Sequence, residues 1–258
     1  MKMNCKCEGI SQRIEKMVED FTVLCYDKSR KPTIGQGGFM ITYSDIKNNE
    51  TIRTYIKKAD ESLNALGYTE HSVAHVAKVA ETAGAILTTL GYSEREVELV
   101  KIAGFLHDIG NLVNRVEHSQ SGAVMAFRIL DKLGMPAEDI ADVVTAIGNH
   151  DEGTAVPVNA ISAALFLADK SDVRRTRVRN HDFSTFDIHD RVNYSVSKYS
   201  LTISEDKTEI WLALEIDTQY SSVTDYFEIF LQRMILCRKA AERLGLKFRL
   251  AINDQVLM

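Results

Sequence analysis

The chain has 258 residues, of which 45% are hydrophobic and 26% are charged, and its formal net charge is −5. This composition is typical of a folded protein with one large domain, or with one large domain and a small companion, and it excludes long disordered regions. The acidic balance argues against a general binder of nucleic acids or anionic membranes, because such proteins usually carry an excess of basic residues. We therefore expect any anionic ligand to be attracted by a local cluster of cations.

The N-terminal twenty residues lack the apolar core of a secretory signal, and no stretch reaches the ~18 apolar residues that a membrane helix needs. We therefore expect a cytoplasmic protein that does not contact membranes. The four cysteines are scattered along the chain and are expected to be reduced.

Residues 1–48 are predicted to form a helix and a turn that pack on the main body. Apolar residues recur at three- and four-residue steps from Ile10 to Leu24, which predicts an amphipathic helix. Three glycines at positions 35–38 then precede a strand-like run from Phe39 to Tyr43. A P-loop would open a helix and end in a lysine, so this stretch is interpreted as a turn.

Residues 49–190 are predicted to be a helical domain. From Glu50 to Asp172 the apolar residues follow a helical period almost throughout, and glycines interrupt it at intervals. Four apolar stripes lie at Val97–Leu106, Ala123–Leu133, Ile140–Ile147 and Ile161–Ala168. The second stripe includes Phe127 and Leu133. Together the stripes predict a bundle of helices around one core.

Residues 191–258 are predicted to form a small unit with the order β-β-α-β. Alternating apolar residues on either side of the turn Ser204–Lys207 predict a β-hairpin. A helix from about Val223 to Leu244 follows, Gly245 ends it, and Phe248–Ile252 predict a last strand. The expected fold class is mainly α, a helical bundle with a small C-terminal α+β unit.

Histidine and aspartate interrupt three of the predicted apolar faces. His107, His150 and Asp169 each follow apolar residues at three- or four-residue steps. A core face does not hold such groups without a partner, so all three are expected to point inward. Asp108 diverges from His107 by about 100° on a helix, so the two can share a metal only if it lies beside the helix. This mixture of nitrogen and oxygen donors suits manganese, iron, zinc, nickel or cobalt better than calcium.

Five short motifs carry the candidate donors, and His71, His118, His150 and Asp169 each lie at or near an expected helix end. The motifs are EHS at His71, FLHDIG at residues 105–110, HSQSGA at His118, NHDE at His150 and LADKSD around Asp169. In this order they resemble the HD-domain superfamily of metal-dependent phosphohydrolases, and the resemblance covers roughly residues 49–179. It implies an all-helical bundle.

The resemblance also implies the site. His71, His107, Asp108 and Asp169 would hold a first metal, and subfamilies with two metals add two histidines, matched here by His118 and His150. Asp108 would be the catalytic residue, since it would bridge both ions and position a hydroxide that attacks a phosphate ester or anhydride. The cofactor would be one or two divalent ions of Mn, Fe, Ni, Co or Zn. His75 lies four residues after His71, but helix register alone places many pairs so, and it is left out of this set.

One departure from the family pattern limits the substrate. The subfamily that cleaves cyclic dinucleotides has a lysine after HDIG and a doubled histidine before the glutamate, whereas this chain has Asn111 and a single His150. This argues against hydrolysis of cyclic-di-GMP.

A basic run follows Asp169 in this otherwise acidic chain. The predicted substrate-binding residues are Lys170, Arg174, Arg175 and Arg177. Arginine suits phosphate because its planar fork donates two hydrogen bonds at once. The alternative is a solvated helix end whose cations favour the negative end of the helix dipole.

The expected partner is a phosphorylated small molecule, with a nucleotide as one candidate, and not a nucleic-acid polymer. Two other functions stay open, an HD-type di-iron oxygenase and a catalytically idle sensor of a phosphorylated ligand. The C-terminal unit is compatible with a role in covering the site or in forming a homodimer.

Overall fold

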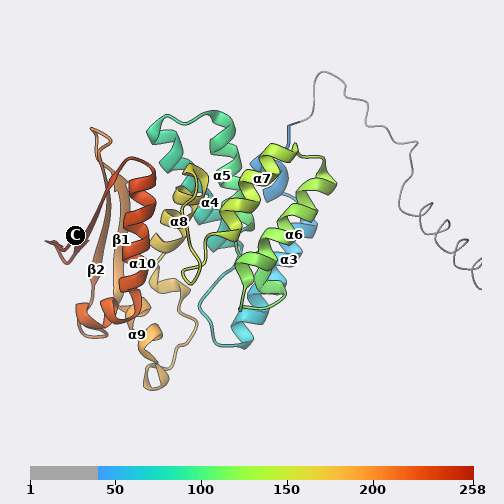
Figure 1. The fold of residues 1–258 in the computed structure, drawn as a ribbon. Coiled ribbons are helices and arrows are strands. Elements are labelled where there is room, and N and C mark those ends of the chain that lie inside the picture. The colour runs from blue at the N-terminus through green and yellow to red at the C-terminus, as the bar shows by residue number, and fades with distance from the viewer. Residues whose placement is uncertain (1–39) are drawn as a thin grey trace, which may run out of the picture. The chain divides into compact units, whose positions relative to one another are not determined.

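The computed structural model describes residues 40–258, and packed helices make up most of this part of the chain (Figure 1). The predicted helix at Ile10–Leu24, the glycine-rich turn and three of the four cysteines lie outside the described residues. The helices of the bundle are α2 (Tyr43–Lys47), α3 (Glu50–Ala65), α4 (Val73–Leu90), α5 (Glu94–Leu106), α6 (His118–Leu133), α7 (Ala137–Gly148) and α8 (Ala160–Ser171). The short 3₁₀ helix η1 (Ile109–Leu112) connects α5 towards α6. The mainly α fold predicted from the sequence is confirmed.

Two close helix contacts position the candidate donors. In α5, a Cβ atom added at Gly104 would lie 2.7 Å from the Cα of Ala80, so only glycine lets α5 pack this tightly on α4. In η1, a Cβ atom at Gly110 would lie 2.0 Å from the carbonyl oxygen of His118, so only glycine lets η1 lie against the first turn of α6. The first contact sets the end of α5 beside α4, and the second sets Asp108 beside His118.

The C-terminal part is a four-stranded sheet with one covering helix. Strands β1 (Val196–Ile203) and β2 (Glu209–Ile216) form an antiparallel hairpin, and β3 (Lys247–Ile252) pairs with β2 in parallel after the crossover helix α10 (Val223–Arg243). Figure 1 shows α10 between the sheet and α8, which both contact it. The predicted β-β-α-β order is thus confirmed, and the short strand β4 (Gln255–Val256) extends it at the sheet edge.

The segment between α8 and β1 holds the 3₁₀ helices η2 (Arg175–Arg177) and η3 (Phe183–Thr185) and the helix α9 (Ile188–Ser195). Helix α9 spans the boundary predicted at residues 190 and 191, and residues 41–258 form one compact unit. Within the described part of the chain, no helix is both long enough and apolar enough to cross a membrane.

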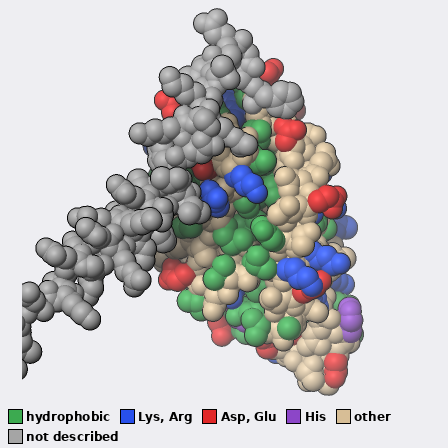
Figure 2. Space-filling model, turned by 90° about the vertical axis from the view of Figure 1, so that its right-hand side faces the viewer, with side chains coloured by type: hydrophobic (Ala, Val, Ile, Leu, Met, Phe, Trp, Pro, Cys, Tyr) green, Lys and Arg blue, Asp and Glu red, His purple; other side chains and the backbone are tan. Residues whose placement is uncertain are grey.

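Two local predictions were wrong. Met40–Thr42 form no strand, and Tyr43 opens α2, because Thr42 caps this helix through a reciprocal capping box with Asp45. In α6, Phe127 is 51% exposed and Leu133 is 37% exposed, so the buried face of this helix runs through smaller residues and Leu130 instead. Figure 2 shows the resulting mixture of apolar and charged side chains on the face of the bundle that bears α3 and α6.

Candidate metal centre

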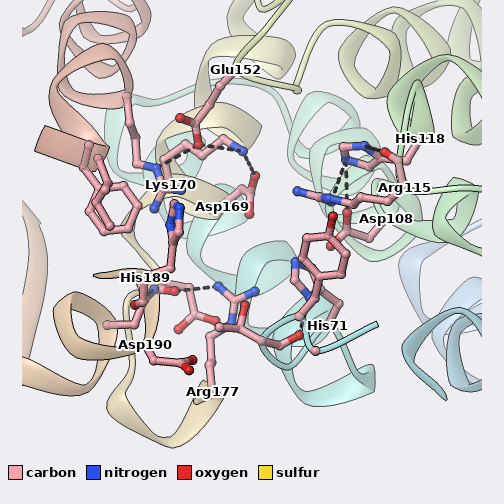
Figure 3. A pocket seen from close by; sticks show the side chains of 18 of the residues that line it. His71, Asp108, Arg115, His118, Glu152, Asp169, Lys170, Arg177, His189 and Asp190 are labelled. Atoms are coloured by element: carbon pink, nitrogen blue, oxygen red, sulfur yellow. Dashed lines mark hydrogen bonds and ion pairs between the residues drawn. The ribbon is translucent and has the colours of Figure 1, made fainter. Parts of the chain in front are cut away.

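Six buried or nearly buried donors meet where the ends of five helices converge. His75 lies in the first turn of α4, His107 and Asp108 directly follow α5, and Asp169 lies in the last turn of α8. His118 is the first residue of α6, and His150 follows the end of α7. All four imidazoles are at most 3% exposed. Asp108, His118 and Asp169 are visible in Figure 3.

The carboxylate of Asp108 lies at the centre of this cluster, and its two oxygens face different histidines. Its Oδ2 lies 3.2 Å from Nε2 of His107 and 3.6 Å from Nε2 of His75. Its Oδ1 lies 3.5 Å from Nε2 of His118 and 3.9 Å from Nε2 of His150. The cluster therefore divides into two halves that share one carboxylate.

We call these halves the first and second half-sites. The first half-site consists of His75, His107, Asp169 and Asp108 Oδ2, and Oδ1 of Asp169 lies 3.4 Å from Nε2 of His75 and 3.7 Å from Nε2 of His107. The second half-site consists of His118, His150 and Asp108 Oδ1, and the two Nε2 atoms of its histidines lie 3.1 Å apart.

Each of the four imidazoles is held by a hydrogen-bond acceptor at its other nitrogen. Nδ1 lies 2.8 Å from the Gly104 carbonyl oxygen in His107, 3.1 Å from that of Arg115 in His118 and 2.6 Å from that of Ile147 in His150. In His75, Nδ1 lies 2.8 Å from Oδ2 of Asp172. A carbonyl or carboxylate oxygen only accepts, so Nδ1 carries a hydrogen in each ring, and it is Nε2 that points inward and would offer its lone pair to a metal.

Acceptor atoms converge at the centre of this arrangement. Nε2 of His75 and Nε2 of His107 are buried and have no hydrogen-bond partner among the described residues. Lone pairs and carboxylate oxygens that converge in a buried space repel one another unless a cation lies between them. The residues therefore fit a metal ion, and their mixture of imidazole and carboxylate donors suits Mn, Fe, Ni, Co or Zn.

The carboxylates are ionised at neutral pH. Burial would raise the pKa of Asp108, but His107 and His71 hold it well below its ordinary value. Burial would likewise raise the pKa of Asp169, but Lys170 and His75 hold it well below that value. Burial lowers the pKa of His118 to about 4 and that of His71 to about 3, so both rings are neutral. The two carboxylates and His118 are thus in the protonation states that a metal requires, whereas a metal at His107 would displace the proton that its raised pKa favours.

The histidines are expected to give the metal-free protein a stability maximum near pH 6.5, their ordinary pKa. Below this pH, His71 and His118 bind protons in the unfolded chain but not in the folded protein, because folding lowers their pKa values. The free energy of unfolding therefore falls as pH falls. Burial would lower the pKa of His107, but Asp108 and Asp169 raise it, so the stability from His107 is lost as pH rises above 6.5. Urea unfolding in a chelator at about pH 5, 6.5 and 8 measures this. A free energy that increases from pH 6.5 to 5 would contradict it.

His71 and His75 occupy different places from those predicted. Helix α4 begins at Val73 and is capped by Ser72, so His71 precedes the helix and does not share a helical face with His75. The His71 ring lies 5.6 Å from that of His75 at the wall of the cavity, and its role as a metal ligand stays a prediction from the sequence. His75 lies on the buried face of α4 with Val79, and the same apolar-face argument that identified His107 would have identified it.

Sequence reasoning also missed two residues that hold the donors in place. Asn111 donates from Nδ2 to Oδ1 of Asp108 over 2.9 Å, so the residue that departs from the cyclic-dinucleotide pattern orients the central carboxylate. Asp172 is the acceptor for His75, and it pairs in turn with Arg174 at 2.7 and 3.0 Å. Only their spacing after the HD and LADKSD motifs marks them in the sequence.

A cavity of about 420 Å³ opens onto the cluster (Figure 3). Its walls come from the loop before α4, from α9 and from α10, and four cations line it: Arg115, Lys170, Arg177 and Arg233. Lys170 Nζ lies 2.7 Å from Oδ2 of Asp169. Arg177 donates to the carbonyl oxygens of Glu70, over 2.9 Å, and Asp172, over 2.7 Å. Two of the four predicted substrate-binding residues therefore lie at this cavity.

The other two lie elsewhere. Arg174 is held by Asp172, and the guanidinium of Arg175 lies 4.6 Å from the centre of the Tyr194 ring and 5.5 Å from that of Tyr220. Neither is among the residues that line the cavity. Their contacts are those of a packed chain segment after α8.

Residues 72–179 match the family model described as HD domain. The chain contains an HD domain. The matched range includes every donor of both half-sites, and it begins one residue after His71. HD domains bind divalent metals, and the match over these residues supports a relation to metal-dependent hydrolases.

Two proteins are similar to this chain. The uncharacterized protein MJ1020 of Methanocaldococcus jannaschii is 23% identical over 217 residues, which cover 75% of this chain and 82% of that protein. A crystal structure described as a predicted HD superfamily hydrolase from an uncultured Thermotogales bacterium is 24% identical, with a TM-score of 0.39, and the match covers 48% of this chain and 67% of that one.

Proposed function

We propose that this protein is a metal-dependent phosphohydrolase with a two-metal site. The observation that carries the proposal is the orientation of Asp108, whose two oxygens face two separate pairs of histidine lone pairs. A carboxylate placed in this way can bridge two cations, whereas a single cation would need only one of its oxygens.

The two half-sites define the ligands. His75, His107, Asp169 and Asp108 would hold the first metal, and Asp108, His118 and His150 would hold the second. Bound divalent metals supply a Lewis acid for a phosphoryl oxygen and make water acidic enough to attack phosphorus. The protein itself supplies orientation, because Asn111 and Asp172 fix two of these ligands through the hydrogen bonds described above.

The cavity supports phosphate as the reacting group. Arg177 lies close enough to the cluster for Asp169 and Asp108 to act on its pKa, although burial is the main effect and lowers that pKa. Its planar fork, together with Arg115 and Lys170, can neutralise an anion next to the half-sites. The wall also carries carboxylates, and Lys170 pairs with Asp169 and Arg233 with Glu152, so Arg115 and Arg177 are the cations that support an anionic substrate.

His71 is proposed to orient water and not to act as a ligand. Its Nδ1 lies 2.7 Å from the carbonyl oxygen of Thr69, so Nδ1 carries the hydrogen and Nε2 keeps a lone pair at the cavity wall. With a pKa of about 3 the ring stays neutral, so we propose that its Nε2 accepts a hydrogen bond that orients the attacking water.

The substrate is proposed to be a phosphorylated small molecule, with a nucleotide as one candidate. A cavity of about 420 Å³ lies in the range of small-molecule sites. The absence of a nucleic-acid partner stays a prediction from the sequence. The cytoplasmic location, the homodimer and the domain boundary at residues 190 and 191 stay predictions from the sequence.

The test combines metal analysis with an activity panel. The protein purified without added metal is analysed for transition metals, and phosphate release is then measured across phosphorylated metabolites with Mn, Fe, Ni or Co. We expect up to two metals per chain and release from at least one class of substrate. A fully loaded protein that releases phosphate from none of them would overturn the proposal.

Arg177 and Arg175 provide a matched pair for the substrate site. We expect Arg177→Gln to raise KM by about tenfold, equivalent to about 1.4 kcal/mol of lost phosphate binding, with a smaller change in kcat. Arg175→Gln should leave KM unchanged, because the side chain packs on Tyr194 and does not line the cavity. Steady-state kinetics decide between them, and thermal melts show whether either variant is misfolded. Equal KM effects in both variants would contradict this assignment.

A further inference from the structure

Arg115 extends over the second half-site. Its Nη1 lies 3.3 Å from Nε2 of His118 and 3.4 Å from Oδ1 of Asn111, and its guanidinium carbon lies 5.7 Å from the centre of the Tyr68 ring. Figure 3 shows this side chain beside His118 and Asp108. The guanidinium thus occupies the approach from the cavity to one half-site.

The two half-sites differ in what meets their lone pairs. In the second half-site the Nδ1 atoms of His118 and His150 both donate to backbone carbonyl groups, and their Nε2 atoms lie within hydrogen-bond distance of each other, at 3.1 Å. The low pKa of His118 leaves its ring neutral, so its Nε2 is an acceptor. Nη1 of Arg115 donates to this Nε2. In the first half-site, Nε2 of His75 and Nε2 of His107 have no such donor among the described residues. In the second half-site a cation of the protein thus donates to a histidine Nε2, whereas in the first half-site the nearby cation, Lys170, contacts Oδ2 of Asp169 and leaves both histidine Nε2 atoms without a donor.

We propose that Arg115 gates the second half-site by competing with the second metal, and that phosphate bound in the cavity releases it. This inference rests on the two-metal site proposed above. A metal in the second half-site needs the His118 lone pair to which Arg115 now donates. Arginine cannot lose its charge, so metal and guanidinium repel each other at this distance.

Phosphate reverses this competition. The oxygens of a phosphate group accept two parallel hydrogen bonds from a guanidinium, and Arg115 lines the cavity that would receive the phosphate. Once Arg115 turns to the phosphate, the His118 lone pair is free for the metal. Phosphate and the second metal must then each strengthen the binding of the other, because such coupling is reciprocal. The enzyme would load its second metal fully only when substrate is present.

Calorimetric titration of the metal-free full chain with Mn²⁺, with and without inorganic phosphate, tests the gate. We expect wild-type protein to bind one metal tightly and a second at least about tenfold more weakly. Phosphate should reduce this difference in affinity by strengthening the second binding event. Arg115→Met keeps an unbranched apolar stem and removes the guanidinium and its charge. It should tighten the second binding event by about tenfold without phosphate, and phosphate should then add little.

Arg128→Met is the matched control, because Arg128 lies on α6, is 76% exposed at its side chain and does not line the cavity. It should titrate like wild type, and it also accounts for binding of Mn²⁺ by phosphate in solution. Arg115→Gln removes the same charge and must agree with Arg115→Met, so a folding defect in one variant does not decide the result. Two metals with unchanged affinities in both Arg115 variants would overturn the gate alone. Wild-type protein that binds no metal would overturn the proposed function itself.

Discussion

Asp108→Asn is expected to remove both metals and to lower phosphate release by about a thousandfold, equivalent to about 4 kcal/mol of transition-state stabilisation. The carboxylate has one oxygen in each half-site, at 3.2 Å from Nε2 of His107 and at 3.5 Å from Nε2 of His118. Asparagine offers a single oxygen and no charge, and its amide group would present hydrogens to one pair of lone pairs. Both half-sites are damaged by one substitution.

Metal analysis and phosphate release on the same preparation measure this effect. The comparison variant is His118→Gln, which removes a ligand of the second half-site alone and should leave one metal bound. Asp131→Asn serves as the control, since this carboxylate is 56% exposed on α6 and does not line the cavity. If Asp108→Asn retains two metals, the carboxylate does not bridge them, and the two-metal site is wrong.

His75→Gln is expected to have the second largest effect, a loss of the first metal and a fall in activity of about a hundredfold or more, equivalent to about 2.7 kcal/mol. The ring is fully buried, Nδ1 is held by Asp172, and Nε2 has no partner other than the carboxylates of the first half-site. His71→Gln should behave differently, since its ring is in neither cluster. It should keep the metal content of wild type and lower kcat.

Comparing His75→Gln with His71→Gln distinguishes His75, the ligand inferred from the structure, from His71, the ligand predicted from the sequence. Atomic absorption after dialysis gives the metal content, and a melting curve in chelator shows whether each variant folds without metal. A His71→Gln protein that loses the metal, beside a His75→Gln protein that keeps it, would restore the sequence prediction.

The sequence was sufficient for the fold because its signals are periodic. The apolar period of Glu50–Asp172, the hairpin around Ser204–Lys207 and the helix stop at Gly245 each have a local physical cause, and each was found where expected. Thr42 was missed because a capping box outweighed the extended propensity of a short apolar run.

The site was predictable only in part, for a geometric reason. The inward direction of their faces and the HD motifs pointed to one cluster, and the structure brings His107, Asp108, His118, His150 and Asp169 together, while their role as metal ligands stays a prediction. The choice between His71 and His75 depended on where α4 begins, and a shift of two residues in a helix start moves a side chain off the face. Arg115 and Asp172 act through contacts between distant segments, which no local pattern encodes.

The distribution of the donors over five helix ends has a consequence for assembly. The first half-site joins α4 to α8, which lie at opposite ends of the HD domain in sequence, and both half-sites are tied to α5 through one carboxylate. No isolated helix pair of this set contains a complete half-site, so metal affinity appears only after the whole bundle has formed. By mass action, an ion that binds only the assembled state stabilises that state. Bound metals would therefore stabilise the folded HD domain, and their availability in the cell would affect the fraction of folded molecules as well as the activity.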